Sequence, residues 1–328
     1  SNPRCRDGSP VMVRWRLALL VSPLFLFFSL LALIQIISIE YGATPPITST
    51  RPLRLDRQLQ QLSSDPLNPR RLPTVLLIGV RKGGTRALLD AIALHPRVRA
   101  ARKEVHFFDD QRNYEKGEDW YREQMPTSSV DQVTIEKTPA YFTNEAVPSR
   151  VHRFNPRMKL ILIVREPLQR TISDFTQVFY NRLETNKSLP VFERAAFDRV
   201  NGKIDQSYKP IRNSLYAMHL SRWLQYFPLD QILILDGDVF VKDPLSQLRL
   251  VESFLGLPHS ISSSQLVFKA EKGFFCFQKT PSSRVRCLGR TKGRAHRSID
   301  KTVAKRLRRQ FIPHNNKFFR LINRVFNW

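Results

Sequence analysis

The chain has 328 residues, of which 42% are hydrophobic and 25% charged, and 53 Lys and Arg against 28 Asp and Glu give a formal net charge of +25. Apolar residues are plentiful, while Gly numbers only 12 and Cys only 3, so a disordered chain, a collagen-like repeat and a disulfide scaffold are excluded. A charge this basic predicts a polyanionic partner: nucleic acid, an anionic membrane surface, or an acidic polysaccharide or phosphate-bearing ligand.

The first 39 residues predict a membrane anchor. Residues 17–39 carry no charged side chain, and a helix of this length, at about 1.5 Å per residue, crosses a bilayer core of roughly 30 Å. Residues 1–16 hold four Arg and one Asp. The positive-inside rule therefore keeps this arm in the cytosol and places the rest of the chain in a lumen, as a single-pass type II protein. The main alternative is a cleaved signal peptide that releases the remainder into the same lumen.

Residues 40–72 predict a stem, because Pro is frequent there among Ser, Thr, Gln and Arg, and such a stretch does not bury a core. We therefore expect the folded lumenal domain over 73–328. The cytosolic arm carries +3 of the net charge, so +22 belongs to the lumenal side. This distribution argues against nucleic acid as the partner.

Cysteine usage agrees with an oxidising lumen. Cys276 and Cys287 lie in one Gly-, Ser- and Pro-containing stretch and are close enough in sequence to close a short disulfide loop. Two unpaired thiols are the alternative, and a zinc site that adds His296 has unsuitable ligand spacing. The sequon that begins at Asn186 predicts a glycan site.

Apolar runs in the lumenal part alternate with helical patterns. The predicted strands cover 74–80, 159–165 and 232–235, and the predicted helices cover 87–94, a segment from about 167, and 244–255. Pro167 and Pro244 suit a first helical turn, where a missing N–H costs nothing. We therefore expect an α/β fold of three layers, P-loop-like, with a mostly parallel central sheet and helices on both faces.

A glycine-rich loop connects the first predicted strand to its helix. Gly83 and Gly84 let the backbone approach an anion, the N–H groups at the helix start point toward it, and Lys82 adds a cation. This pattern is typical of a phosphate-binding loop. It differs from a Walker A motif, in which Lys and Ser/Thr follow the second Gly. A tight turn with surface cations is the alternative for this segment alone.

Five separated motifs extend this pattern along the lumenal part. They are GVRKGGTRALL at 79–89, EVHFFD at 104–109, EKTPAYF at 136–142, the segment 164–177, and CLGRTKGRAH at 287–296. Together they resemble the heparan sulfate glucosamine 3-O-sulfotransferases, in register from about residue 72 to residue 328. The resemblance implies a P-loop-like α/β fold, the donor 3′-phosphoadenosine 5′-phosphosulfate, heparan sulfate chains as acceptor, and residence in the Golgi membrane.

The resemblance also implies a donor site. The glycine loop would hold the 5′-phosphosulfate, with Lys82 stabilising charge on the bridging oxygen. Arg165 ends a strand and Ser173 lies about two turns into the next helix, so both can face one anion, the 3′-phosphate. A second basic loop would close over the nucleotide. The implied donor residues are Lys82, Gly83, Gly84, Thr85, Arg86, Arg165, Ser173, Lys292, Gly293, Arg294, Ala295 and His296.

Glu104 is the implied general base, because nearby cations keep a carboxylate ionised and ready to accept a hydroxyl proton. His106 is the rival base, since it lies two residues away on the same side of an expected extended segment. Lys137 is implied to contact both the acceptor and the sulfuryl group. The implied acceptor residues are Arg81, Arg86, Glu104, Val105, His106, Phe107, Phe108, Asp109, Asp110, Lys137, Thr138, Pro139, Ala140, Tyr208, Lys209 and Arg286.

The leading hypothesis is transfer of a sulfuryl group to the 3-OH of glucosamine by in-line displacement, with no metal in the chemical step. The alternatives are sulfotransfer to another position or glycan, and a catalytically silent heparan sulfate binding protein. A nucleotide kinase is disfavoured by the position of Lys82. The sequence defines neither the preferred sulfation pattern nor the oligomeric state.

Overall fold

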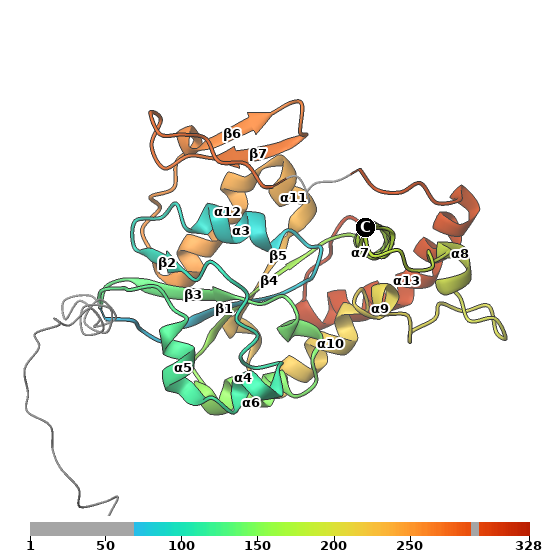
Figure 1. The fold of residues 1–328 in the computed structure, drawn as a ribbon, viewed down its shortest axis with the longest axis horizontal. Helices are drawn as coiled ribbons and strands as arrows, with labels where there is room; N and C mark the ends of the chain where they lie inside the picture. Colours follow the sequence, from blue (N-terminus) through green and yellow to red (C-terminus); the bar gives the residue numbers. More distant parts are fainter. Residues whose placement is uncertain (1–68, 290–294) are drawn as a thin grey trace, which may run out of the picture. The chain divides into compact units, whose positions relative to one another are not determined.

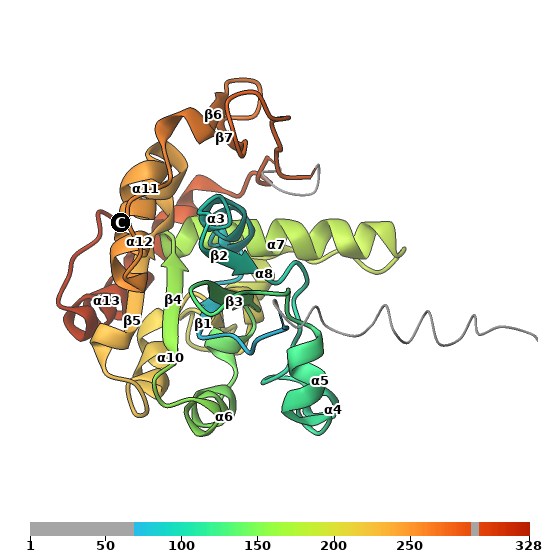
Figure 2. The same ribbon diagram turned by 90° about the vertical axis from the view of Figure 1, so that its left-hand side faces the viewer.

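The computed structural model describes residues 69–289 and 295–328, which form a parallel sheet between two layers of helices (Figure 1, Figure 2). The strands lie in the order β2-β3-β1-β4-β5, all parallel. Their bounds are β1 Val75–Gly79, β2 Val98–Ala100, β3 Val133–Lys137, β4 Lys159–Val164 and β5 Ile232–Asp236. The α/β fold with a parallel sheet is therefore confirmed.

The central strands bury alternate residues on opposite faces of the sheet. In β1, Val75 and Leu77 belong to one hydrophobic cluster, and Leu76 and Ile78 belong to the other. All four side chains are at most 2% exposed. A strand covered on both faces needs a continuous apolar run rather than an alternating one, which is why this segment is apolar throughout.

Helices cover both faces. One face packs against α3 (Thr85–Ile92) and α12 (Pro244–Leu255). The other packs against α5 (Gly117–Glu123), α6 (Val147–Phe154), α10 (Tyr216–Trp223) and α13 (Lys301–Ile322). The remaining elements are α4 Gln111–Tyr114, α7 Pro167–Glu184, α8 Phe192–Ala195, α9 Lys209–Arg212, α11 Gly237–Lys242, and the 3-10 turns η1 Tyr141–Thr143, η2 Leu229–Gln231 and η3 Ser263–Gln265.

The predicted helix starts at Pro167 and Pro244 are confirmed. The residue before each proline supplies a cap: the Glu166 side chain accepts a hydrogen bond from the Gln169 N–H, and the Asp243 side chain accepts one from the Ser246 N–H. An acidic cap satisfies a helix-start donor and also interacts favourably with the helix dipole. The two prolines were the signal for these starts, and the structure adds the acidic caps.

A two-stranded antiparallel hairpin, β6 (Leu266–Lys269) and β7 (Phe274–Phe277), lies beyond α12 and α11 (Figure 1). The predicted disulfide is confirmed, because Cys276 of β7 is bonded to Cys287. Beside it, Phe277 and Arg286 exchange both backbone hydrogen bonds, at 2.9 and 2.7 Å. The disulfide and this bridge together fix the segment that follows β7 against the hairpin.

In residues 69–289 and 295–328, no helix is long and apolar enough to cross a membrane. The predicted cytosolic arm and transmembrane segment lie outside the described residues, as does most of the predicted stem.

Candidate active site

The loops that follow β1, β3, β4 and β5 meet at one edge of the sheet, because the carboxyl ends of parallel strands share an edge. The chain leaves β1 toward β2 on one side and leaves β4 toward β5 on the other, so the switch point of the topology lies between β1 and β4. Ligands of open α/β sheets bind at such a point. A cavity of about 860 Å³ lies here, and Lys137, Arg165 and Gly237, from the ends of three strands, line it.

The glycine loop forms one wall of this cavity. A Cβ added to Gly83 would lie 2.5 Å from the carbonyl oxygen of Ile163, so only glycine fits there. The Gly83 N–H donates to the Val80 carbonyl at 2.8 Å and so serves the turn itself. Gly84, with φ of 105°, begins α3, whose first turn has no side-chain cap. An anion at this wall would therefore face the N–H groups of the first turn of α3.

Arg165 and Ser173 line the same cavity, as the sequence predicts. Arg165 follows β4, and its Nε donates to Oδ1 of Asp238 in α11 at 3.0 Å. Ser173 is 9% exposed on α7. The carboxylate of Asp238 therefore holds the Arg165 guanidinium at the wall of the cavity that Ser173 also lines.

His296 marks a positively charged corner of the cavity. Burial lowers the pKa of His296, and the charges of Arg165 and Lys82 lower it further. Burial and these two cations therefore favour the neutral form of the imidazole. Of the predicted loop over the nucleotide, Lys292, Gly293 and Arg294 lie outside the described residues, and Ala295 does not line the cavity.

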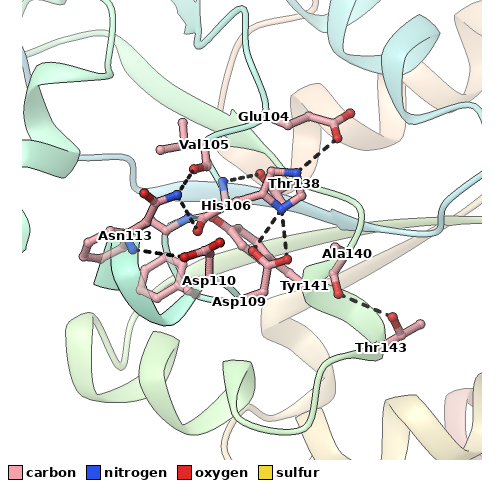
Figure 3. Close-up of polar contacts among 12 residues, drawn as sticks. Glu104, Val105, His106, Asp109, Asp110, Asn113, Thr138, Ala140, Tyr141 and Thr143 are labelled. Atoms are coloured by element: carbon pink, nitrogen blue, oxygen red, sulfur yellow. Dashed lines mark hydrogen bonds and ion pairs between the residues drawn. The ribbon is translucent and has the colours of Figure 1, made fainter. Parts of the chain in front are cut away.

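Four charged or titratable side chains line the cavity together: Glu104, His106, Asp109 and Lys137. The Lys137 ammonium pairs with Oε1 of Glu104. His106 lies between two carboxylates, with Nε2 at 3.7 Å from Oε2 of Glu104 and Nδ1 at 2.9 Å from Oδ2 of Asp109 (Figure 3). The Lys137 side chain is 4% exposed and that of Glu104 is 41% exposed, so a buried cation holds a carboxylate that faces the cavity.

The backbone at His106 differs from the expected extended segment. Its φ is 54°, in the left-handed region that non-glycine residues rarely adopt. The expectation of an extended strand-like segment is therefore wrong at this residue. The side chain still lies beside Glu104, because the turn and the Asp109 contact direct it there.

The buried side chain of Glu136 stabilises the turn at His106 through hydrogen bonds. Its Oε1 accepts hydrogen bonds from the Thr138 hydroxyl at 2.6 Å and from the Val105 N–H at 3.4 Å. The Thr138 oxygen in turn accepts from the His106 N–H at 3.3 Å (Figure 3). Burial raises the pKa of Glu136 to about 7, although its hydrogen bonds and Lys137 oppose this. The sequence motifs do not single out Glu136 as a site residue, although its position in the buried strand β3 is the signal for it.

Seven of the residues implied for acceptor contact do not line this cavity: Val105, Phe107, Phe108, Asp110, Thr138, Tyr208 and Arg286. The Phe107 ring stacks on that of Tyr121 within the core, with centroids 4.2 Å apart. The Asp110 side chain caps α4. Arg286 lines a second cavity beside the first. EVHFFD therefore combines residues that face the site with residues that anchor it in the core.

Arg81 lines the cavity and is held by a buried ion pair network. Its Nε donates to Oδ1 of Asp174 at 2.9 Å, and Arg170, which is fully buried, donates to Oδ2 of Asp174 and to the Arg81 carbonyl. Burial raises the pKa of Asp174, but Arg170 and Arg81 outweigh it and keep the pKa below its ordinary value. The guanidinium of Arg81 is therefore oriented before any ligand binds.

Two further sets of lining residues were absent from the sequence prediction. Thr176, Gln177 and Asn181 follow Ser173 on one face of α7 at helical spacing, so periodicity was the signal for them. An apolar wall was not detectable, because α11, α12 and β7 supply it from separate parts of the chain. This wall consists of Phe240, Val241, Pro244, Phe274 and Phe275.

Comparison with known proteins agrees with the motifs. Residues 72–324 match the sulfotransferase domain family. The chain is 48% identical over 257 residues to heparan sulfate glucosamine 3-O-sulfotransferase 5 of Mus musculus, which covers 78% of this chain and 74% of the relative. It is 44% identical over 261 residues to heparan sulfate glucosamine 3-O-sulfotransferase 3B1 of Homo sapiens, and this alignment covers 79% of this chain and 65% of the relative.

Among solved structures, a sulfotransferase from Alicyclobacillus acidocaldarius matches with a TM-score of 0.57 at 18% identity, covering 78% of this chain and 98% of that one. This likeness shows a shared fold. With nearly half of the aligned residues identical to named relatives, the chain belongs to the heparan sulfate glucosamine 3-O-sulfotransferase family.

Proposed function

We propose that this protein transfers a sulfuryl group from 3′-phosphoadenosine 5′-phosphosulfate to the 3-OH of glucosamine units in heparan sulfate. The observation that carries this proposal is the pair formed by Glu104 and Lys137 in a cavity walled by the glycine loop. A carboxylate able to accept a proton lies there beside a cation able to stabilise a transferring anionic group.

The donor fits the wall on the side of α3 and α7. The first turn of α3 and Lys82 would hold the 5′-phosphosulfate, and Arg165 with Ser173 would hold the 3′-phosphate. The apolar wall of Phe240, Phe274 and their neighbours suits the flat faces of an adenine ring. The basic loop at 292–296 would close over the bound nucleotide.

The reaction needs one proton transfer and one displacement. Glu104 takes the proton of the acceptor 3-OH as its oxygen attacks sulfur, and the bond between sulfur and the bridging phosphate oxygen breaks. The products are the 3-O-sulfated sugar and 3′-phosphoadenosine 5′-phosphate, whose 5′-phosphate keeps the electron pair of the broken bond. Lys82 and Lys137 would stabilise negative charge on the leaving oxygen and on the sulfuryl oxygens. No covalent enzyme intermediate forms.

The acceptor would contact Arg81, Arg86 and Lys209, which line the same cavity and supply cations for sulfate and carboxylate groups. His106, fixed by Asp109, would hydrogen-bond the sugar or Glu104 rather than act as the base. This assignment follows from the ion pair of Glu104 with the buried Lys137, which orients the carboxylate into the cavity.

We further propose that the protein acts in the Golgi lumen, attached to the membrane through residues 17–39. The unbroken apolar run and its basic flank support this placement. The disulfide between Cys276 and Cys287 suits an oxidising compartment. Asn186, exposed after the end of α7, is accessible to a glycan.

The test is transfer of radiolabelled sulfate to a defined heparan sulfate oligosaccharide, with mapping of the modified hydroxyl. We expect wild type to sulfate the 3-OH, and Glu104→Gln to lower kcat by about 10² to 10⁴, the usual contribution of a general base. Calorimetry with 3′-phosphoadenosine 5′-phosphate should give the same Kd for both proteins. Glu123→Gln, which changes an exposed carboxylate outside the cavity, is the matched control.

Each contrary result identifies a different error. Product sulfated only at the 2-OH or 6-OH would reject the assigned position. Heparan sulfate binding without nucleotide binding would indicate a silent binding protein. Retention of most activity by Glu104→Gln would reject Glu104 as the base and favour His106.

A further inference from the structure

The turn at His106 belongs to no helix or strand. Three consecutive N–H groups, at positions 105–107, donate instead to side chains at the end of β3 and just after it. The acceptors are Oε1 of Glu136 at 3.4 Å, the Thr138 hydroxyl oxygen at 3.3 Å and the Tyr141 hydroxyl oxygen at 3.0 Å. The backbone of the turn is therefore fixed by side chains that lie 31 to 34 positions later in the chain.

Asn113 of α4 holds the carbonyl groups of the same turn. Its Nδ2 donates to the carbonyl oxygen of Val105 at 3.2 Å and to that of His106 at 3.3 Å (Figure 3). The Asp110 side chain, which caps α4, accepts from the Asn113 N–H at 3.3 Å and so fixes the position of Asn113. Side chains of separate elements thus bond both the N–H groups and the carbonyl groups of Val105 and His106.

Glu136 is the centre of the contacts from β3. It is fully buried, and its Oε1 accepts from both the Thr138 hydroxyl and the Val105 N–H. The Thr138 oxygen then accepts from the His106 N–H, so one carboxyl group stabilises two successive peptide groups. The φ of 54° at His106 is a conformation that persists only where the surrounding structure holds it. These contacts supply that support.

Neither Asn113 nor Glu136 lines the active-site cavity, so neither touches a reactant bound there. Glu104 and His106 do line it, and Lys137, which follows Glu136 in β3, pairs with Glu104. A misplacement of about 1 Å in a reacting group can cost about a hundredfold in rate. The hydrogen bonds that hold the turn therefore affect the reaction through the position of Glu104.

We propose that Asn113 and Glu136 are positioning residues for sulfuryl transfer. Asn113 holds the carbonyl groups of the turn and Glu136 holds its N–H groups, and together they keep Glu104 oriented toward the acceptor hydroxyl. The proposal rests on the proposed function for the identity of the reaction. It adds two residues that touch neither the donor nor the acceptor and yet determine the rate.

The test compares Asn113→Ala, Glu136→Met and Glu136→Gln with wild type. Met resembles Glu in length but accepts only weak hydrogen bonds, whereas Gln keeps a carbonyl oxygen for the Thr138 hydroxyl and the Val105 N–H. We expect Asn113→Ala and Glu136→Met to lower kcat about 10- to 100-fold and Glu136→Gln to keep kcat near the wild-type value. KM for the acceptor should not change, nor should the Kd and the binding stoichiometry of 3′-phosphoadenosine 5′-phosphate, because the cations for both reactants lie outside the turn.

A double-mutant cycle tests whether the two residues act through Glu104. Asn113→Ala and Glu136→Met are each combined with Glu104→Gln. If both residues act by orienting Glu104, the second change adds little to the loss caused by Glu104→Gln alone, since residues that act as a unit are not additive. Decreases in kcat that multiply would overturn the proposal, and so would a wild-type kcat in Asn113→Ala and Glu136→Met.

Amide hydrogen exchange reports on the turn without any reaction. The N–H groups at 105–107 all donate to side chains, so they should exchange slowly in wild type. We expect Asn113→Ala and Glu136→Met to speed exchange in a peptide that covers the turn by about tenfold, and Glu136→Gln to leave it unchanged. Wild-type exchange in Asn113→Ala and Glu136→Met would overturn the proposal. If wild type transfers no sulfate, the proposed function fails, and exchange still decides whether the two residues hold the turn.

The matched control is Glu252→Met. Glu252 is another buried carboxyl group, which accepts from the N–H groups of Ser260 and Ile261, each at 2.8 Å, and does not line the cavity. We expect this variant to unfold at lower urea concentration than wild type, as Glu136→Met does, but to keep the wild-type kcat and the wild-type exchange at 105–107. An equal decrease in kcat in both Met variants would mean that lost stability alone lowers the rate, and would overturn the positioning role.

Discussion

Glu136→Gln should stabilise the protein at alkaline pH and leave its stability unchanged in acid. Glu136 is fully buried, and burial raises its pKa from 4.5 to about 7. Below pH 4.5 the carboxyl group is protonated in both the folded and the unfolded state. Between pH 4.5 and 7 it loses its proton in the unfolded chain but keeps it in the fold, so the free energy of unfolding falls as the pH rises.

The size of this effect follows from the two pKa values. Each pH unit between them changes the free energy of unfolding by about 1.4 kcal/mol, so wild type loses about 3 kcal/mol by pH 8 through this group. Gln has nearly the same shape, and its carbonyl oxygen can accept from the Thr138 hydroxyl and the Val105 N–H, but it does not ionise. The variant therefore avoids the loss and should be about 3 kcal/mol more stable than wild type at pH 8.

Urea denaturation of both proteins at several pH values between 4.5 and 8 measures this difference. The gap between the two unfolding free energies should be near zero at pH 4.5, open through pH 7 and then remain constant. Glu123→Gln, whose side chain stays in water on folding, should show no comparable gap. Parallel curves for wild type and Glu136→Gln would refute the reasoning, because they would mean that burial does not retain the proton on Glu136.

Two further predictions concern donor binding and are read by calorimetry with 3′-phosphoadenosine 5′-phosphate. Ser173→Ala should weaken binding about tenfold, the cost of one hydrogen bond to a charged group, without changing KM for the acceptor; an unchanged Kd would remove Ser173 from the phosphate site. Gly83→Ala should weaken donor binding by about a hundredfold or more, because the new Cβ would meet the Ile163 carbonyl at 2.5 Å and displace the loop. Gly289→Ala, whose added Cβ meets nothing within 4 Å, is the control, and equal donor affinity in both glycine variants would contradict the prediction.

The sequence predicted the parts of the fold that depend on local pattern. The apolar runs became β1, β4 and β5, and a proline marked the start of α7 and of α12. Short elements such as β2 were missed, because Val98–Ala100 has only one residue that favours strands, Val98, and is stabilised by pairing with β3. That pairing is a long-range contact and leaves no periodicity in the sequence.

The candidate site likewise has residues that the sequence indicated and residues that only the fold brings together. The family resemblance assigned Glu104, Lys137, Arg165 and Ser173 to one site, and all four line one cavity. It could not tell which residues of EVHFFD face that cavity, since a left-handed turn at His106 decides this. The apolar wall and the second cavity were also beyond reach, because each is built by separate segments of the chain that only the fold brings together.

Positive side chains of this basic protein lie close enough to repel one another where the donor would bind. Burial first, and then Arg165 and Lys82, lower the pKa of His296, so in the free protein a proton on this imidazole would add a third positive charge to the same corner. Asp238 offsets part of this charge through its contact with Arg165. An anion with two phosphate groups offsets more of it and favours protonation of His296. By linkage, protonation of His296 would then favour binding of that anion, so we expect the affinity for the anion to rise as the pH falls through the titration of His296.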